Sequence, residues 1–165
     1  MADLTLPTTR SVGPAASSVA ASDTYSGDFH AWAFRQAALL REGRRSELDW
    51  ENLAEEIGDL GTSQRSELVS RLEVLLTHLL KWQFQPERRG RSWSQTIAEQ
   101  RDRIGRLKRR SPSLRAFQEQ ALGDAYGIAV RRAAHESNLP ERALPGECAY
   151  TLDQVLDVDF WPGPV

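Results

Sequence analysis

Apolar residues recur at helical spacing along most of the chain, and two stretches near the N-terminus show the pattern first, residues 28–43 and 48–61. On a helical wheel, one side of the first stretch carries Phe29, Trp32, Ala33, Gln36, Ala37 and Leu40. One side of the second carries Trp50, Leu53, Ala54, Ile57 and Leu60. Because Gly43 and Gly61 stand where these patterns stop, the sequence predicts a helix in each stretch, ending or bending at the glycine.

The broadest apolar stripe follows in residues 62–85, and its width is typical of a helix at the centre of a bundle. It consists of Leu68, Leu72, Leu75, Leu79 and Trp82, flanked by Val69, Leu76 and Leu80. Further helical patterns cover 92–110 and 112–138, and Thr151 with Gln154 has capping-box spacing for a short last helix. Strand signals are nearly absent. The predicted fold is all-α, a compact bundle of four to five helices plus a short C-terminal helix.

Composition divides the 165 residues into a tail and a body. Residues 1–24, rich in Ala, Ser, Thr and Pro and poor in charge, are expected to be a disordered tail. Residues 25–165 have the length of a single helical domain. No apolar run is long enough to span a membrane. The only cysteine, Cys148, leaves no internal disulfide, which favours a cytoplasmic protein.

Charge is unevenly distributed although the net charge is −2. Residues 46–73 carry eight acids and two bases, whereas residues 86–110 carry nine bases and three acids. The bases either pair internally or at a dimer interface, or they form an anion-binding surface. The best candidates for anion binding are Lys81, Arg88, Arg89 and Arg91. A nucleic-acid partner is possible but not favoured, because such domains usually carry a marked positive excess.

The acidic helix also suggests a metal or acid–base site. Asp49 and Glu56 border its apolar side, and His78 flanks the stripe of the next predicted helix. Helical bundles hold metals with a repeated Glu-x-x-His motif, which this chain lacks. It also lacks a phosphate-binding loop and a nucleophile elbow. No cofactor and no catalytic residue is therefore expected from the motifs.

The two charged segments carry a family resemblance. LDWENLAEEIGDLG and HLLKWQFQPERRGRSWSQTIAEQR, with YSGDFHAWAFRQAALLREG, SPSLR and CAYTLDQVL, resemble a bacterial family catalogued as domain of unknown function twenty-nine. The resemblance extends from about Tyr25 to Phe160. It implies an all-α fold and a bacterial cytoplasmic protein, but no activity or site. This chain departs from the pattern at Gly58, which costs about 1 kcal/mol relative to Ala in a helix.

Three functions are open at this point. The first is a non-catalytic helical interaction or structural protein, self-associating as a homodimer or bound to an unidentified protein partner. The second is a nucleic-acid or polyanion-binding module that uses residues 81–110. The third is a metal-assisted hydrolase built around Asp49, Glu56 and His78.

Overall fold

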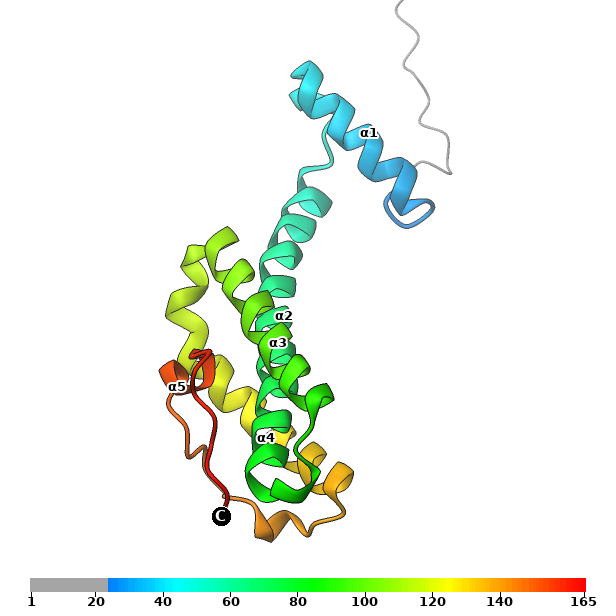
Figure 1. The fold of residues 1–165 in the computed structure, drawn as a ribbon. Helices are drawn as coiled ribbons and strands as arrows, with labels where there is room; N and C mark the ends of the chain where they lie inside the picture. The colour runs from blue at the N-terminus through cyan, green and yellow to red at the C-terminus, as the bar shows by residue number, and fades with distance from the viewer. Residues whose placement is uncertain (1–23) are drawn as a thin grey trace, which may run out of the picture. The chain divides into compact units, whose positions relative to one another are not determined.

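The computed structural model describes residues 24–165, so residues 1–23 of the predicted tail lie outside the described part of the chain. The described residues fall into two compact units, 24–56 and 57–165. Figure 1 follows the chain by colour from residue 24 to residue 165. One helix, α2 (Trp50–Phe84), contributes to both. Two compact units that share a helix can still unfold together as one domain. The single domain expected over residues 25–165 therefore stays a prediction.

Residues 24–165 contain five α-helices and no β-strand, which confirms the all-α prediction. The helices are α1 (Phe29–Glu42), α2 (Trp50–Phe84), α3 (Arg91–Arg110), α4 (Gln118–Ser137) and α5 (Leu152–Leu156). Short 3-10 helices join them at Arg45–Glu47, Pro86–Arg88, Pro112–Phe117 and Glu141–Ala143. Among the described helices, none is both long enough and apolar enough to cross a membrane.

The prediction of separate helices over 48–61 and 62–85 is wrong, because α2 runs unbroken through Gly58 and Gly61. A glycine inside a helix costs about 1 kcal/mol without forcing a stop. At either glycine an added Cβ would meet nothing within 4 Å. No close packing therefore requires glycine in this turn of α2.

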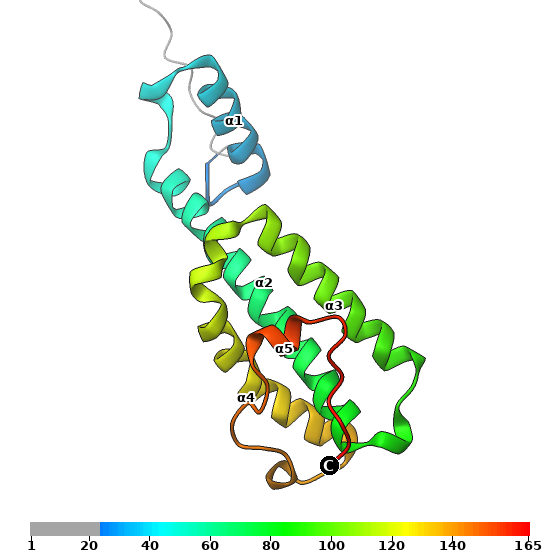
Figure 2. The ribbon, with the colours of Figure 1, turned by 60° about the vertical axis from the view of Figure 1, so that its left-hand side comes forward.

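In the C-terminal unit, α2, α3 and α4 lie side by side around a leucine core (Figures 1 and 2). The stripe predicted for 62–85 is the centre of this core, with Leu72, Leu75 and Leu79 fully buried. α3 adds Ile97, Ile104 and Leu107, and α4 adds Ala121, Ala125, Ala129 and Ala133. The alanines lower the cost of close helix approach because they have no long side chain to displace.

The C-terminal segment closes the core of this unit. α5 begins with a capping box in which Thr151 and Gln154 bond reciprocally, as the sequence predicted. Val155 on α5 is fully buried. Arg101 of α3 then holds the following residues by donating to the carbonyl oxygens of Val155, Val158 and Phe160, at 3.0, 3.3 and 2.8 Å.

The N-terminal unit, described over residues 24–56, is a short helical hairpin. Asp28 caps α1 by accepting a hydrogen bond from the Ala31 N–H, and Gly43 ends α1 with a φ of 71°. This positive φ favours glycine, as the sequence predicted. The buried residues of α1 are Trp32, Gln36 and Leu39.

Several predicted inward-facing side chains are exposed, which corrects the sequence analysis. On α1, Phe29 and Leu40 are half exposed. On α2, Trp50, Ile57 and Leu60 are 59%, 67% and 66% exposed. Helical periodicity identifies the apolar side of a helix but not whether another element covers it.

Candidate functional site

Polar side chains join α1 to the start of α2 in the N-terminal unit. The Trp32 Nε1 donates to the Asp49 carboxylate at 3.0 Å, and Gln36 accepts from the Asp49 backbone N–H at 2.9 Å. Asp49 also accepts from the side chain of Asn52 at 2.7 Å. These hydrogen bonds hold the pKa of Asp49 below its usual value, and the bond from Asn52 contributes more than the bond from Trp32. Asp49 is thus an ionised anchor of the hairpin.

A second contact closes the hairpin beside this anchor. The Tyr25 hydroxyl donates to Glu56 at 2.7 Å. The Tyr25 ring packs edge-on against Trp32, with ring centroids 4.9 Å apart. Both acids proposed for the metal site, Asp49 and Glu56, therefore serve as hydrogen-bond acceptors that hold α1 and α2 together.

The outer surface of this unit is unusually apolar for its size. Phe29, Phe34, Leu40 and Trp50 are 51%, 66%, 50% and 59% exposed. A hollow of about 450 Å³ at the turn between the helices is lined by Leu39, Leu40, Gly43, Arg45, Leu48 and Trp50. Trp50 is oriented at its edge by a 3.1 Å hydrogen bond from Nε1 to the Arg45 carbonyl. The unit thus presents an apolar hollow with fixed walls.

Some charged side chains near this hollow form ion pairs and others do not. Arg44 pairs with Glu42 and Glu47 at 3.0 and 2.6 Å, which neutralises the turn itself. In contrast, Arg41 and Arg45 at the α1 end, and Glu51 and Glu55 at the α2 start, have no side-chain partner among residues 24–165. Within residues 24–56 the unit therefore carries positive and negative side chains without a described partner, on different elements.

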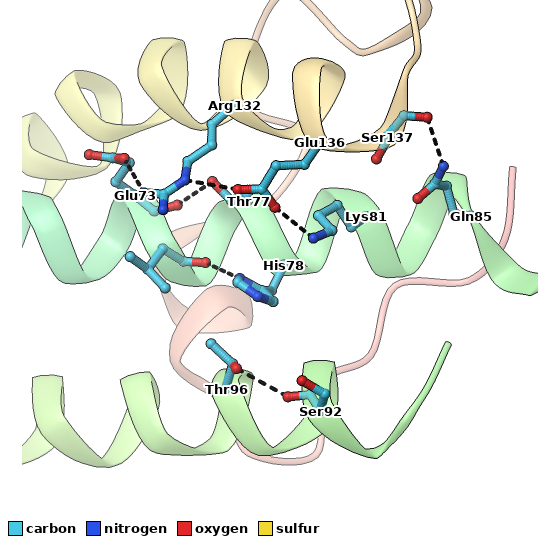
Figure 3. A network of polar contacts seen from close by, with 11 residues as sticks. Glu73, Thr77, His78, Lys81, Gln85, Ser92, Thr96, Arg132, Glu136 and Ser137 are labelled. Carbon is cyan, nitrogen blue, oxygen red and sulfur yellow. Dashed lines mark hydrogen bonds and ion pairs between the residues drawn. The ribbon is translucent and has the colours of Figure 1, made fainter. Parts of the chain in front are cut away.

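In the C-terminal unit, a polar network links α2 to α4 (Figure 3). Lys81 is buried and its Nζ lies 2.6 Å from Glu136. Arg132 bridges Glu136 and Glu73, at 3.1 and 2.9 Å. The Lys81 Nζ also lies 4.7 Å from the centre of the Trp93 ring. Every charge in the network has a partner, and the pairs join α2 to α4.

His78, the third residue proposed for the metal site, lies beside this network. Its Nδ1 donates to the Val74 carbonyl at 2.8 Å, and burial lowers the pKa of the imidazole. In the described part of the chain, no three His, Cys, Asp or Glu side chains come together as a metal site would require. The metal site of Asp49, Glu56 and His78 stays a prediction to which the geometry adds no support.

The four residues predicted to bind anions have unequal surroundings. Lys81 is committed to Glu136. Arg89 donates through Nε to the Trp82 carbonyl at 2.7 Å and lies over the Trp82 ring. Arg88 and Arg91 are exposed, and neither side chain has a partner within residues 24–165. Anion binding at these four residues stays a prediction.

Three further titratable side chains of this unit, Cys148, Tyr126 and Tyr150, donate hydrogen bonds to neighbouring residues. Burial raises the pKa of the Cys148 thiol, whose Sγ donates to the Tyr150 carbonyl. Burial also raises the pKa of Tyr126 to about 12, and its hydroxyl donates to the Pro145 carbonyl at 2.8 Å. The Tyr150 hydroxyl donates to Gln83. These groups fasten residues 144–150 to the bundle.

Taken together, the fold and these contacts define a small all-α protein built of a three-helix bundle and an apolar helical hairpin. The chain matches the family model described as "Domain of unknown function DUF29" over residues 24–161, and it belongs to that family. No curated protein and no solved structure matches it.

Proposed function

We propose that this protein is a self-associating interaction module and that two copies join through their N-terminal units. The observation that carries the proposal is the balance of surface in residues 24–56. Four large apolar side chains there are at least half exposed, namely Phe29, Phe34, Leu40 and Trp50. The buried residues of the same segment are Trp32, Gln36, Leu39 and Leu48.

Such a hairpin gains little from its own core. Segments below about 40 residues rarely bury enough apolar surface to be stable without further support. Covering Leu40 and Trp50, which line the hollow, would add roughly 25 cal/mol for each Å² of apolar surface removed from water. The hollow lined by Leu40 and Trp50 is a concave place for an apolar side chain to enter. Association through this surface would supply the missing burial.

Charge favours a second copy as the occupant. A two-fold interface brings the same two patches together twice, once in each direction. The unpaired Arg41 and Arg45 of one copy can then face the unpaired Glu51 and Glu55 of the other, and the reverse. Such complementarity guides orientation and opposes wrong partners. A bacterial cytoplasmic setting, expected from the sequence, is part of the same proposal.

Sedimentation velocity of the full chain over a range of concentrations tests the proposal. The chain mass is 18.5 kDa, and the proposal predicts a species of twice that mass that grows with concentration. Changing Leu40→Ser and Trp50→Ser together should shift the protein toward the single-chain mass. Val158→Ser is the matched control, because Val158 is 68% exposed in the C-terminal unit. A single-chain mass at every concentration, or equal loss in the control, would refute it.

A further inference from the structure

Two grooves in the C-terminal unit are lined by cations of α3, and their surroundings differ. The first, of about 370 Å³, is lined by Glu67, Arg71, Arg103, Arg106, Leu107 and Arg110. The second, of about 410 Å³, has four cations in its wall: Arg101, Lys108, Arg109 and Arg115. We call the second one the Lys108 groove.

The first groove is largely neutralised by carboxylates of the same helices. Arg103 pairs with Glu99 at 2.5 Å, and Arg106 pairs with Asp102 at 2.6 Å. Arg71 pairs with Glu67 at 2.7 Å, and Glu67 also lies 4.0 Å from Arg110. An anion entering this groove would have to displace carboxylates that already satisfy these guanidinium groups.

The Lys108 groove has no carboxylate in its wall. The side chains of Lys108, Arg109 and Arg115 make no hydrogen bond or ion pair with any residue in 24–165. Three cations that converge on one concave surface without a counter-ion raise the local positive potential. The positive potential of the groove would therefore attract a negatively charged group.

Arg101 adds a buried charge to the same wall. Its side chain is only 5% exposed, and its three hydrogen bonds go to neutral carbonyl oxygens. Asp157 and Asp159 act on it only through space, and burial lowers the pKa of its guanidinium. A buried cation without a bonded carboxylate is costly unless negative charge comes near. An anion in the Lys108 groove would add to the negative charge that Asp157 and Asp159 already place near Arg101.

We propose that the Lys108 groove binds the phosphate group of a small phosphorylated molecule. Lys108, Arg109 and Arg115 would contact the phosphate, because guanidinium and ammonium groups are the side chains that suit its oxygens. Ile104, Pro112 and Leu156 complete the wall and offer apolar contact to the rest of the ligand. A volume of about 410 Å³ lies in the range of sites for small molecules.

Isothermal titration of the full chain with inorganic pyrophosphate tests the site, with adenosine diphosphate as a second probe that carries an apolar face. Binding should weaken as salt is added, since the contacts are ionic. The double change Lys108→Gln with Arg109→Gln should lower affinity about tenfold or more. Arg103→Gln with Arg106→Gln removes the same charge from the same helix and should change affinity by less than about twofold. Circular dichroism melts of both variants confirm that each is folded.

Other outcomes would overturn the proposal. Equal losses in the two double variants would show that net charge, and not the groove, attracts the anion. No binding of either small phosphate at low salt would also refute it. A single-stranded oligonucleotide tested in parallel separates a nucleic-acid surface from the proposed site. If only the oligonucleotide binds, and Lys108→Gln with Arg109→Gln weakens its binding no more than Arg103→Gln with Arg106→Gln does, the basic surface binds nucleic acid and the proposed site is refuted.

Discussion

Replacing Arg101 by methionine should loosen the C-terminal segment of the bundle. Arg101 is the buried cation of α3, and its guanidinium holds the carbonyls of Val155, Val158 and Phe160. The side chain also lies over the Trp161 ring, 5.5 Å from its centre. Methionine keeps most of the stem's volume but removes all three donors. The variant therefore separates the hydrogen bonds from the packing.

The expected loss of stability is the cost of the lost hydrogen bonds, reduced by the gain from removing a buried charge and from rehydrating a freed carbonyl. Hydrogen bonds from a charged donor are worth about 1.5–3 kcal/mol each, so three of them give at least about 4 kcal/mol. Removing a charge that is buried without a carboxylate partner returns several kcal/mol. The carbonyl of Val158, a residue that is 68% exposed, can also regain water. The free energy of unfolding should fall by about 2 kcal/mol.

Urea unfolding followed by circular dichroism measures this change, and hydrogen exchange locates it. Amides of residues 155–160 should exchange faster in Arg101→Met. Arg103→Met is the matched control, because Arg103 is on the same helix and only its exposed pair with Glu99 is lost. That control should change stability by less than about 0.5 kcal/mol. An Arg101→Met protein as stable as the wild type, with unchanged exchange, would refute the reasoning.

Two further changes test the core and the half-buried histidine, His78. Leu72→Ala, at a fully buried position, should cost about 3–5 kcal/mol in urea unfolding, whereas Leu60→Ala, at a 66% exposed one, should cost far less. Equal costs would contradict the assigned core. Burial lowers the pKa of His78 from 6.5, so the unfolded state binds more protons and stability falls as pH drops below about 6.5. His78→Gln should flatten this dependence in unfolding curves across that range, while His135→Gln, at an exposed site, should retain it.

Sequence periodicity predicted the helices of the C-terminal unit because their apolar stripes are covered. Leu72, Leu75 and Leu79 recur at helical spacing and are fully buried in the core. The same spacing misplaced Trp50 and Leu60, which are 59% and 66% exposed among residues 24–165. The apolar pattern of one helix does not show how far along it the neighbouring helices extend, so it cannot show which of its apolar residues are covered. The unbroken course of α2 was missed because a glycine lowers helix stability by only about 1 kcal/mol and does not by itself end a helix.

The charged residues were harder to predict than the helices. Arg101 was counted with the basic surface, yet it stands four residues after Ile97 and three before Ile104, both buried. This spacing places it on the inner side of α3, and it was the one available signal. Lys81 was likewise predicted to be a surface cation, but it is buried. It pairs there with Glu136, which lies 55 positions later in the sequence. Pairings at such separation are set by packing and cannot be read from one local pattern.

A mixing experiment with reversed charges tests self-association through the N-terminal units most directly. One variant carries Arg41→Glu and Arg45→Glu, and the other carries Glu51→Lys and Glu55→Lys. Each alone brings like charges together in a two-fold pair and should dimerise about tenfold more weakly than the wild type in sedimentation equilibrium. An equimolar mixture restores opposite charges at both contacts and should recover a dimer near wild-type affinity. Dimerisation that neither variant weakens, or a mixture that stays at the mass of one chain, would contradict the account.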